Sequence, residues 1–401
     1  MVKEIKDNIY YVGVLNPNLR IFDVVMTTEY GTSYNAYLVK GNDKTALIET
    51  AHLAYYDAYL ENVNEIVPID KVDYLIMNHN EPDHSGSIRK LLEANPNITV
   101  VTSQAGAIYL KNITNFPELK LQIVKDGESL DLGGKTLEFI NAPFLHWPDS
   151  MFTWLPEDQV LFSCDFLGSH YCEPQLFDTK ITYQDKYLLS FKGYYDAIFG
   201  PFKPYVLKGL DKIKDLDIQY VCTSHGPILT KNCLLKNAQQ SYREWSTVKK
   251  ESYKKIPIFY ASAYGNTGLL AKSIQQGILE KLPDAQVEVY DVNDFEMGDL
   301  ASALNSSDGF LVGSPTINRD AVPPIWMLLS HIDAVNIQKR PAGLFGSYGW
   351  SGEAIPNLRK RLESLKLDLM EDDLRVTFVP TDENLQQARE FGSAFAQKLL
   401  Q

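Results

Sequence analysis

The sequence has few cysteines and no long apolar run. Its 401 residues contain four cysteines, at positions 164, 172, 222 and 233, none of them in a CxxC pair, so a disulfide framework and a zinc finger are excluded. Nowhere do about 18 apolar residues follow one another, and the N-terminal residues show no signal-peptide pattern. We therefore expect a cytoplasmic protein with reduced thiols, Cys164, Cys172, Cys222 and Cys233, and no association with a membrane.

An excess of basic charge is also absent. The chain has 38 Lys and Arg against 51 Asp and Glu, a formal net charge of -13, which argues against binding to nucleic acid or to an anionic membrane surface. No repeat of 20–50 residues and no low-complexity tract occurs. With 45% hydrophobic residues, the composition is that of a globular protein with about two domains.

A polar run near residue 250 divides the chain. Residues 246–255 (STVKKESYKK) lack apolar periodicity, and the next residues begin a strand-like run. We predict domains at 1–250 and 251–401. In the second domain, five apolar runs alternate with helical spacing, which predicts a doubly wound parallel sheet. The predicted strands are Ile256–Tyr260, Val287–Tyr290, Gly309–Val312, Ala342–Phe345 and Val376–Val379, with helices at Leu269–Leu282 and Ala354–Leu367.

The first domain mixes strands and helices in a different order. Strands come first, then strand and helix alternate, and strands return near residue 136, an order that suits two sheets between layers of helices. The predicted strands are Ile9–Val14, Tyr34–Val39, Thr45–Ile48, Tyr74–Met77, Thr99–Thr102, Thr136–Ile140 and Val160–Ser163, with a helix at Ser87–Ala94.

Possible metal ligands gather where predicted strands of the first domain end. After Tyr74–Met77 the chain continues as NHNEPDHSGS, which holds His79, Glu81, Asp83 and His84. His146, Asp165 and His225 also follow strand-like runs, in the segments HWPDSM, FSCD and SHG. Loops anchored by a sheet hold convergent side chains rigidly. Strand ends that point imidazoles and carboxylates in one direction predict a site for two metal ions.

These motifs resemble the metallo-β-lactamase-type domain of flavodiiron proteins, and the resemblance covers the whole first half of the chain. It implies an αββα sandwich. It also implies that one iron is bound by His79, Glu81 and His146, the other by Asp83, His84 and His225, with Asp165 bridging them. The imidazole that matches His84 swings away from the metal in some family members, so whether His84 ligates iron stays open.

Glu81 separates this loop from that of the hydrolytic relatives, which reads HxHxDH and binds zinc. A carboxylate in place of an imidazole gives a harder and more anionic ligand set, which suits iron in two oxidation states better than zinc. Glu81 therefore indicates redox chemistry.

The remaining histidines have weaker interpretations. His170 either hydrogen-bonds a ligand or a bound intermediate or has no role, and Asp149 either orients a ligand histidine or forms a turn. No functional prediction is made for His52 and His331.

Small and hydroxylated residues follow the first strand of the second domain. The segment SAYGNTG, at 262–268, leads into a helix, and exposed N–H groups and hydroxyls at a helix N-terminus bind phosphate. Neither GxGxxG nor GxxxxGK[ST] occurs here, which argues against a dinucleotide and a nucleoside triphosphate. Two further loops, Gly313–Asp320 and Gly346–Gly352, leave the carboxyl ends of strands at the point where the strand order reverses.

This pattern resembles short-chain flavodoxins over residues 256–401 and implies FMN as the ligand. The resemblance places the phosphate at one set of residues, Ser262, Tyr264, Gly265, Asn266 and Thr267. It places the isoalloxazine at a second set, Pro315, Thr316, Asn318, Ser347, Tyr348, Gly349 and Trp350. Tyr348 or Trp350 can stack on the flavin, while core packing against the last helix is the alternative for Trp350.

Together the two resemblances imply a reductase of dioxygen to water, of nitric oxide to nitrous oxide, or of both, with electrons that pass from FMN to two irons. They also imply a head-to-tail homodimer or a dimer of dimers. No CxxC pair of a fused rubredoxin follows, so we expect a separate donor such as rubredoxin or a reduced deazaflavin coenzyme. Two alternatives remain: a zinc hydrolase fused to a flavodoxin-like module, and an electron-shuttling flavoprotein with a structural metal.

Overall fold

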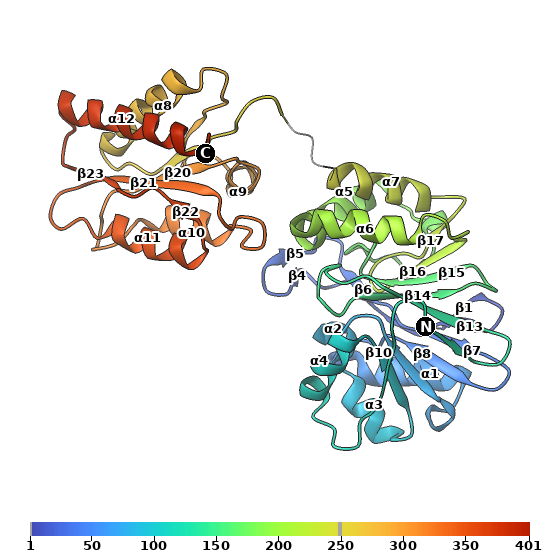
Figure 1. Ribbon diagram of the computed structural model, residues 1–401. Helices are drawn as coiled ribbons and strands as arrows, with labels where there is room; N and C mark the ends of the chain where they lie inside the picture. Colours follow the sequence, from blue (N-terminus) through green and yellow to red (C-terminus); the bar gives the residue numbers. More distant parts are fainter. Residues whose placement is uncertain (1, 248–250) are drawn as a thin grey trace. The chain divides into compact units, whose positions relative to one another are not determined.

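The computed structural model describes residues 2–247 and 251–401, which divide into two compact units at residues 248 and 249 (Figure 1). The middle of the predicted linker, residues 248–250, lies outside the described residues, so the domain limits at 250 and 251 stay a prediction. Among the described residues, no helix has both the length and the apolar character needed to cross a membrane.

The first unit contains two main sheets that face each other. The first sheet runs in the order β1 (Lys3–Lys6), β2 (Ile9–Tyr11), β7 (Tyr37–Lys40), β8 (Thr45–Ile48), β9 (Tyr74–Met77), β10 (Thr99–Thr102) and β11 (Lys120–Ile123). The second runs in the order β12 (Ser129–Asp131), β13 (Thr136–Asn141), β14 (Met151–Leu155), β15 (Val160–Cys164), β16 (Tyr220–Thr223) and β17 (Leu229–Thr230). Two small hairpins pair β3 (Val14–Asn16) with β6 (Thr32–Tyr34), and β4 (Ile21–Phe22) with β5 (Met26–Thr27).

Helices cover the outer faces of both sheets (Figure 1). Those beside the first sheet are α1 (Tyr56–Ile66), α2 (Pro82–Ser85), α3 (Ile88–Ala94) and α4 (Gln104–Thr114); those beside the second are α5 (Gln184–Tyr194), α6 (Lys203–Ile213) and α7 (Leu235–Ser246). One apolar cluster fills the space between the sheets, with Ile76 and Val101 from one and Phe139 and Phe162 from the other. The predicted αββα sandwich is confirmed.

The second unit is a parallel sheet with helices on both faces. The strand order is β19 (Val289–Asp291), β18 (Ile258–Tyr260), β20 (Phe310–Gly313), β21 (Pro341–Tyr348) and β22 (Asp368–Leu369), and β23 (Leu374–Thr377) also pairs with β21. The helices are α8 (Asn266–Lys281), α9 (Met297–Asn305), α10 (Pro323–Ser330), α11 (Ala354–Ser364) and α12 (Asp382–Lys398). This order reverses direction between β18 and β20 and is that of flavodoxin-like sheets, as predicted.

Some predicted strands differ from the observed ones. The run Ile9–Val14 is two strands, β2 and β3, separated by Val12 and Gly13. At Gly13 a Cβ atom would come within 2.4 Å of the Tyr34 carbonyl oxygen, so only glycine fits this close approach of the two chain segments. Tyr34–Val39 is likewise split between β6 and β7. The last predicted strand, Val376–Val379, ends at Thr377, since Phe378 takes a positive φ of 54°.

Candidate metal centre and flavin site

Four buried strand ends of the first unit bring the predicted metal ligands together. His79 and Glu81 follow β9, and Pro82 begins the single turn α2, which carries Asp83 and His84. His146 lies between β13 and β14, Asp165 directly follows β15, and His225 follows β16. Because β9 is flanked by β8 and β10 and is largely buried, the sheet fixes where this loop begins.

The candidate ligands form two groups. In the first, the Nε2 atoms of His79 and His146 lie 3.1 and 3.3 Å from Oε2 of Glu81. In the second, Nε2 of His225 lies 3.0 Å from Oδ2 of Asp83, and Nε2 of His84 lies 3.5 Å from Oδ1 of the same carboxylate. Ligand atoms within each group lie within 4.8 Å of one another, which is the spacing of donors around one ion.

Asp165 belongs to both groups. Its Oδ2 atom lies 3.2 Å from Nε2 of His146 and 3.5 Å from that of His79. Its Oδ1 atom lies 3.2 Å from Nε2 of His84 and 3.4 Å from that of His225. Each oxygen therefore faces a different group, which is the geometry of a carboxylate bridge between two ions.

The polar atoms of this cluster lack protein partners that would satisfy them. Both Oδ atoms of Asp83, Nε2 of His84 and Oδ1 of Asp165 are buried without a hydrogen bond. Orphaned buried polar atoms are costly, and cations at the two positions would satisfy them. The residues therefore fit a pair of metal ions.

Other protein groups orient three of the imidazoles. His225 donates from Nδ1 to the Ser33 carbonyl oxygen at 2.6 Å, which leaves the Nε2 lone pair for a metal. Nδ1 of His79 lies 3.5 Å from Asp149, and Nδ1 of His84 lies 3.4 Å from Glu49. Such outer partners fix the tautomer and direction of a ligating histidine.

The electrostatics of the cluster follow from burial and opposite charges. Burial opposes a charged imidazole at His79, but its contacts with Asp149 and Glu81 outweigh this effect and raise its pKa to about 10. Burial likewise opposes a charged Glu81, yet hydrogen bonds with His146 and His79 hold the pKa of this carboxyl well below its usual range. The anionic set attracts positive charge, whether protons or metal ions.

Two acidic residues near the centre were missed by the sequence analysis. Glu49 follows β8, is 1% exposed, and accepts a hydrogen bond from the Asn78 N–H at 2.8 Å. An acid at the end of an apolar run was the available signal, the same one that revealed Asp165. Asp23 lies in the β4–β5 turn. Partial desolvation and the nearby negative charge of Glu81 raise its pKa to about 6, and nothing in its sequence context marks it.

The structure places the uncertain residues as follows. Asp149 accepts hydrogen bonds from the N–H and side-chain amide of Asn80, both at 2.8 Å, in addition to facing His79. His170 is buried, with Nδ1 2.9 Å from the Thr32 hydroxyl and its ring 5.1 Å from that of His225. Burial and the neighbouring His225 lower the pKa of His170 to about 3, so its imidazole is neutral.

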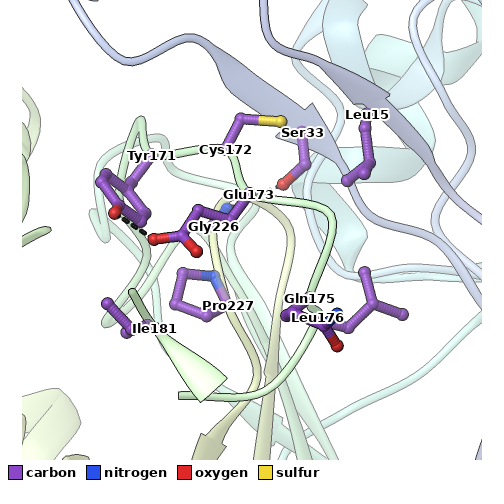
Figure 2. Close-up of a pocket in the computed structure, with 10 residues that line it drawn as sticks. All are labelled: Leu15, Ser33, Tyr171, Cys172, Glu173, Gln175, Leu176, Ile181, Gly226 and Pro227. Atoms are coloured by element: carbon purple, nitrogen blue, oxygen red, sulfur yellow. Dashed lines mark hydrogen bonds between the residues drawn. The ribbon is translucent and has the colours of Figure 1, made fainter. Parts of the chain in front are cut away.

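A small pocket lies beside the loop that carries His225. Its walls include Ser33, Gly226 and Pro227, and Figure 2 shows Tyr171, which donates a hydrogen bond to Glu173, another lining residue. Its volume of about 10 Å³ is about the least that holds one water molecule. The pocket lies next to Ser33, whose carbonyl oxygen accepts the hydrogen bond from His225. It could hold a water molecule there but not a larger ligand.

The predicted flavin residues gather at the carboxyl ends of β18, β20 and β21 in the second unit. Gly265 has a φ of 84° and caps α8, and the Ser262 hydroxyl is buried without a partner in the loop before it. The Thr267 hydroxyl lies 2.9 Å from that of Ser347, which joins two of the loops. An orphaned hydroxyl beside a helix N-terminus fits a phosphate group.

Two details of the flavin region differ from the sequence analysis. Ser347 and Tyr348 still belong to strand β21, so the third loop begins at Gly349 rather than at Gly346. Trp350 is 95% exposed, and the core-packing interpretation of this residue is wrong. Tyr264 is 92% exposed, so both rings are open to a ligand.

Comparisons with known proteins match both units of the chain to known families. The model of the ODP family β-lactamase matches residues 32–226, and the flavodoxin model matches residues 258–392. Flavo-diiron protein FprA2 of Clostridium acetobutylicum is 55% identical over 99% of both chains. The anaerobic nitric oxide reductase flavorubredoxin of Vibrio vulnificus is 33% identical, over 99% of this chain and 80% of its own length.

Solved structures give the same result. Rubredoxin oxygen:oxidoreductase from Desulfovibrio gigas has a TM-score of 0.74 and 28% identity, over 100% of this chain and 99% of its own. The flavodiiron protein from Giardia intestinalis has a TM-score of 0.70 and 28% identity, over 100% and 97% of the two chains. The chain belongs to the flavodiiron proteins and has their cofactors, FMN and two non-haem iron ions.

Proposed function

We propose that this protein reduces dioxygen to water, nitric oxide to nitrous oxide, or both, with electrons that pass from an external donor through FMN to the two irons. The observation that carries this proposal is the position of Asp165, whose two oxygens face the two ligand groups. A carboxylate in this position would hold two ions close enough for both to act on one small molecule.

The composition of the ligand set supports redox chemistry rather than hydrolysis. We assign His79, Glu81 and His146 to one iron and Asp83, His84 and His225 to the other. Two of these six ligands and the bridge are carboxylates, which stabilise the ferric state by their charge. Glu81 contacts both histidines of its group, His79 and His146. Its removal would therefore change the ligand set of the iron that this group binds.

The names of the relatives support both dioxygen and nitric oxide as substrates, and gas-consumption measurements are needed to decide between them. One is a nitric oxide reductase and one an oxygen oxidoreductase by name. A rubredoxin-type donor follows from the same names, and a reduced deazaflavin coenzyme is the alternative donor. We also propose a cytoplasmic location, supported by four free cysteines.

We further propose a head-to-tail homodimer. Each cofactor site lies within its own unit, so a second chain can supply the flavin that faces the irons, and closed twofold assemblies are the commonest. Sedimentation of the holoprotein would test this assembly, and a monomer that is fully active would contradict it.

The function is tested by anaerobic purification, measurement of iron, zinc and FMN per chain, and consumption of each gas with a chemical reductant. The proposal expects two irons, one FMN and turnover of at least one gas. Zinc in place of iron with phosphodiesterase or thioesterase turnover would favour the hydrolase, and iron without gas consumption would favour the electron shuttle.

A further inference from the structure

One pair of redox-active side chains leads from the metal ligands towards the surface of the first unit. Trp147 directly follows His146, and its ring lies 5.3 Å from that of His79 and 6.4 Å from that of His146, edge to face in both cases. Tyr109, on α4, lies 6.0 Å beyond Trp147 at an interplanar angle of 90°. Both rings are partly exposed, so the pair spans the distance between the buried centre and solvent.

The position of Trp147 is fixed by its backbone. Its carbonyl oxygen accepts hydrogen bonds from the Phe144 N–H at 2.7 Å and from the Ser150 hydroxyl at 3.0 Å. These bonds hold the backbone of Trp147, and its ring lies beside two candidate ligands of one ion. The edge-to-face geometry alone is ordinary aromatic packing, so the argument rests on which residues the contacts connect.

We propose that Trp147 and Tyr109 form an exit for oxidising equivalents from the metal centre, and this proposal rests on the proposed dioxygen chemistry. Reduction of dioxygen to water takes four electrons, which reduced FMN and two ferrous irons supply together. When the flavin is oxidised, only the two iron electrons are available and a strong oxidant is left at the centre. An adjacent side chain is then oxidised, and its identity decides whether the ligands survive.

After the two irons have each given one electron, dioxygen still lacks two electrons, so two one-electron transfers along this route, with four protons from water, complete its reduction to water. Each transfer runs in the same way. Trp147 gives one electron to the oxidised centre, and its indole becomes a cation radical without losing a proton. Tyr109 then gives one electron to Trp147, and the phenol O–H bond breaks as its proton passes to water. A thiol or another one-electron reductant in solution restores Tyr109 by hydrogen-atom transfer. No ligand imidazole is consumed.

Other aromatic routes are less suitable for this purpose. Tyr34 lies 6.0 Å from His225 and Tyr194 lies 6.2 Å from it, but both are buried. Burial raises the pKa of Tyr34 to about 12 and that of Tyr194 well above its usual value. A buried phenol has no water to take the proton that its oxidation releases, whereas Tyr109 reaches solvent.

The test follows organic radicals in the holoprotein. Protein with ferrous irons and oxidised FMN is mixed with excess dioxygen without a donor, frozen at intervals and measured by electron paramagnetic resonance. Oxidation of ligand-containing peptides is measured by mass spectrometry. Wild type is expected to give a tyrosyl radical. Y109F, which removes only a hydroxyl, should give a tryptophan radical, with severalfold more ligand oxidation and unchanged iron content and gas consumption.

W147F should lose most of the radical signal, and Y183F, an exposed tyrosine away from the centre, should match wild type. A radical of equal yield and type in wild type, Y109F and W147F would overturn the proposal, as would active wild type without any radical. If no gas is consumed, the proposed function fails separately, and hydrogen peroxide added to the ferrous protein then tests the same route with the same variants.

Discussion

The two units prepare their cofactor sites in opposite ways. In the first, the seven candidate ligands are mostly buried and come from strand ends, and outer partners such as Glu49, Asp149 and the Ser33 carbonyl hold three imidazoles. In the second, Trp350, predicted beside the isoalloxazine, and Tyr264, predicted beside the phosphate, are exposed to solvent. Metal ions need donors fixed in advance, whereas a large planar ligand supplies contact area of its own when it binds.

This difference predicts that substitutions in the first unit act on metal content with large effects, and that those in the second act on flavin affinity with smaller, graded effects.

The largest effect is expected for Asp165→Ala. Removal of the shared carboxylate takes one ligand from each group and leaves Glu81 and Asp83 as the only carboxylates among the remaining ligands. We expect loss of iron from both positions and of gas consumption, with FMN content unchanged. Metal analysis and flavin absorbance measure the two contents, with the exposed Asp126→Ala as the control. Retained turnover would mean that the bridge is misassigned.

A smaller loss is expected for Glu49→Gln. The amide keeps the hydrogen bond from Asn78 but removes the carboxylate that faces Nδ1 of His84. Loss of such an outer partner weakens metal binding by about 10–100-fold. Anaerobic iron titration should show one tight and one weakened position, with Glu173→Gln as the control. Two equally tight positions would show that Glu49 does not orient His84.

Ser262→Ala should weaken FMN binding without a change in iron content. A hydrogen bond to a charged group contributes about 1.5–3 kcal/mol, so the Kd for FMN should rise by about 10–100-fold. Fluorescence quenching of FMN added to the deflavinated protein measures this affinity. The surface variant Ser306→Ala is the control, and an unchanged Kd would remove Ser262 from the phosphate site.

The smallest effect is expected for Trp350→Ala. Loss of ring stacking costs about 0.5–1.5 kcal/mol, which is a rise in the Kd for FMN of about two- to tenfold. Because this ring is 95% exposed, unfolding of the flavin-free protein should change by less than about 0.5 kcal/mol. A large loss of stability would contradict its placement in solvent.

The sequence reveals some parts of the centre better than others. His79, Glu81, Asp83 and His84 lie within six consecutive residues, so their pattern is visible in the sequence alone, and the regular alternation of strands and helices predicts the second sheet. Glu49 carries the same signal as Asp165, an acid after an apolar run, but its contact with His84 is defined only by the fold. Asp23 and Trp147 are likewise defined by contacts with residues far away in the chain.

The exposure of single side chains also depends on the fold. The path of the loop after a strand decides whether an aromatic residue there packs in a core or faces solvent. Trp350 faces solvent. Strand ends shift where a backbone turns to positive φ, as at Phe378.

The position of Asp165 also affects how the centre fills. Burial opposes a charge on this carboxylate, but His84 and His146 outweigh burial and hold its pKa well below the usual value, so it is anionic before either ion binds. The first ion then takes up part of the negative charge that the second would meet, and like charges this close repel each other. The two ions should therefore bind in separate steps, the second with the lower affinity, and a half-loaded centre is an expected stage of assembly.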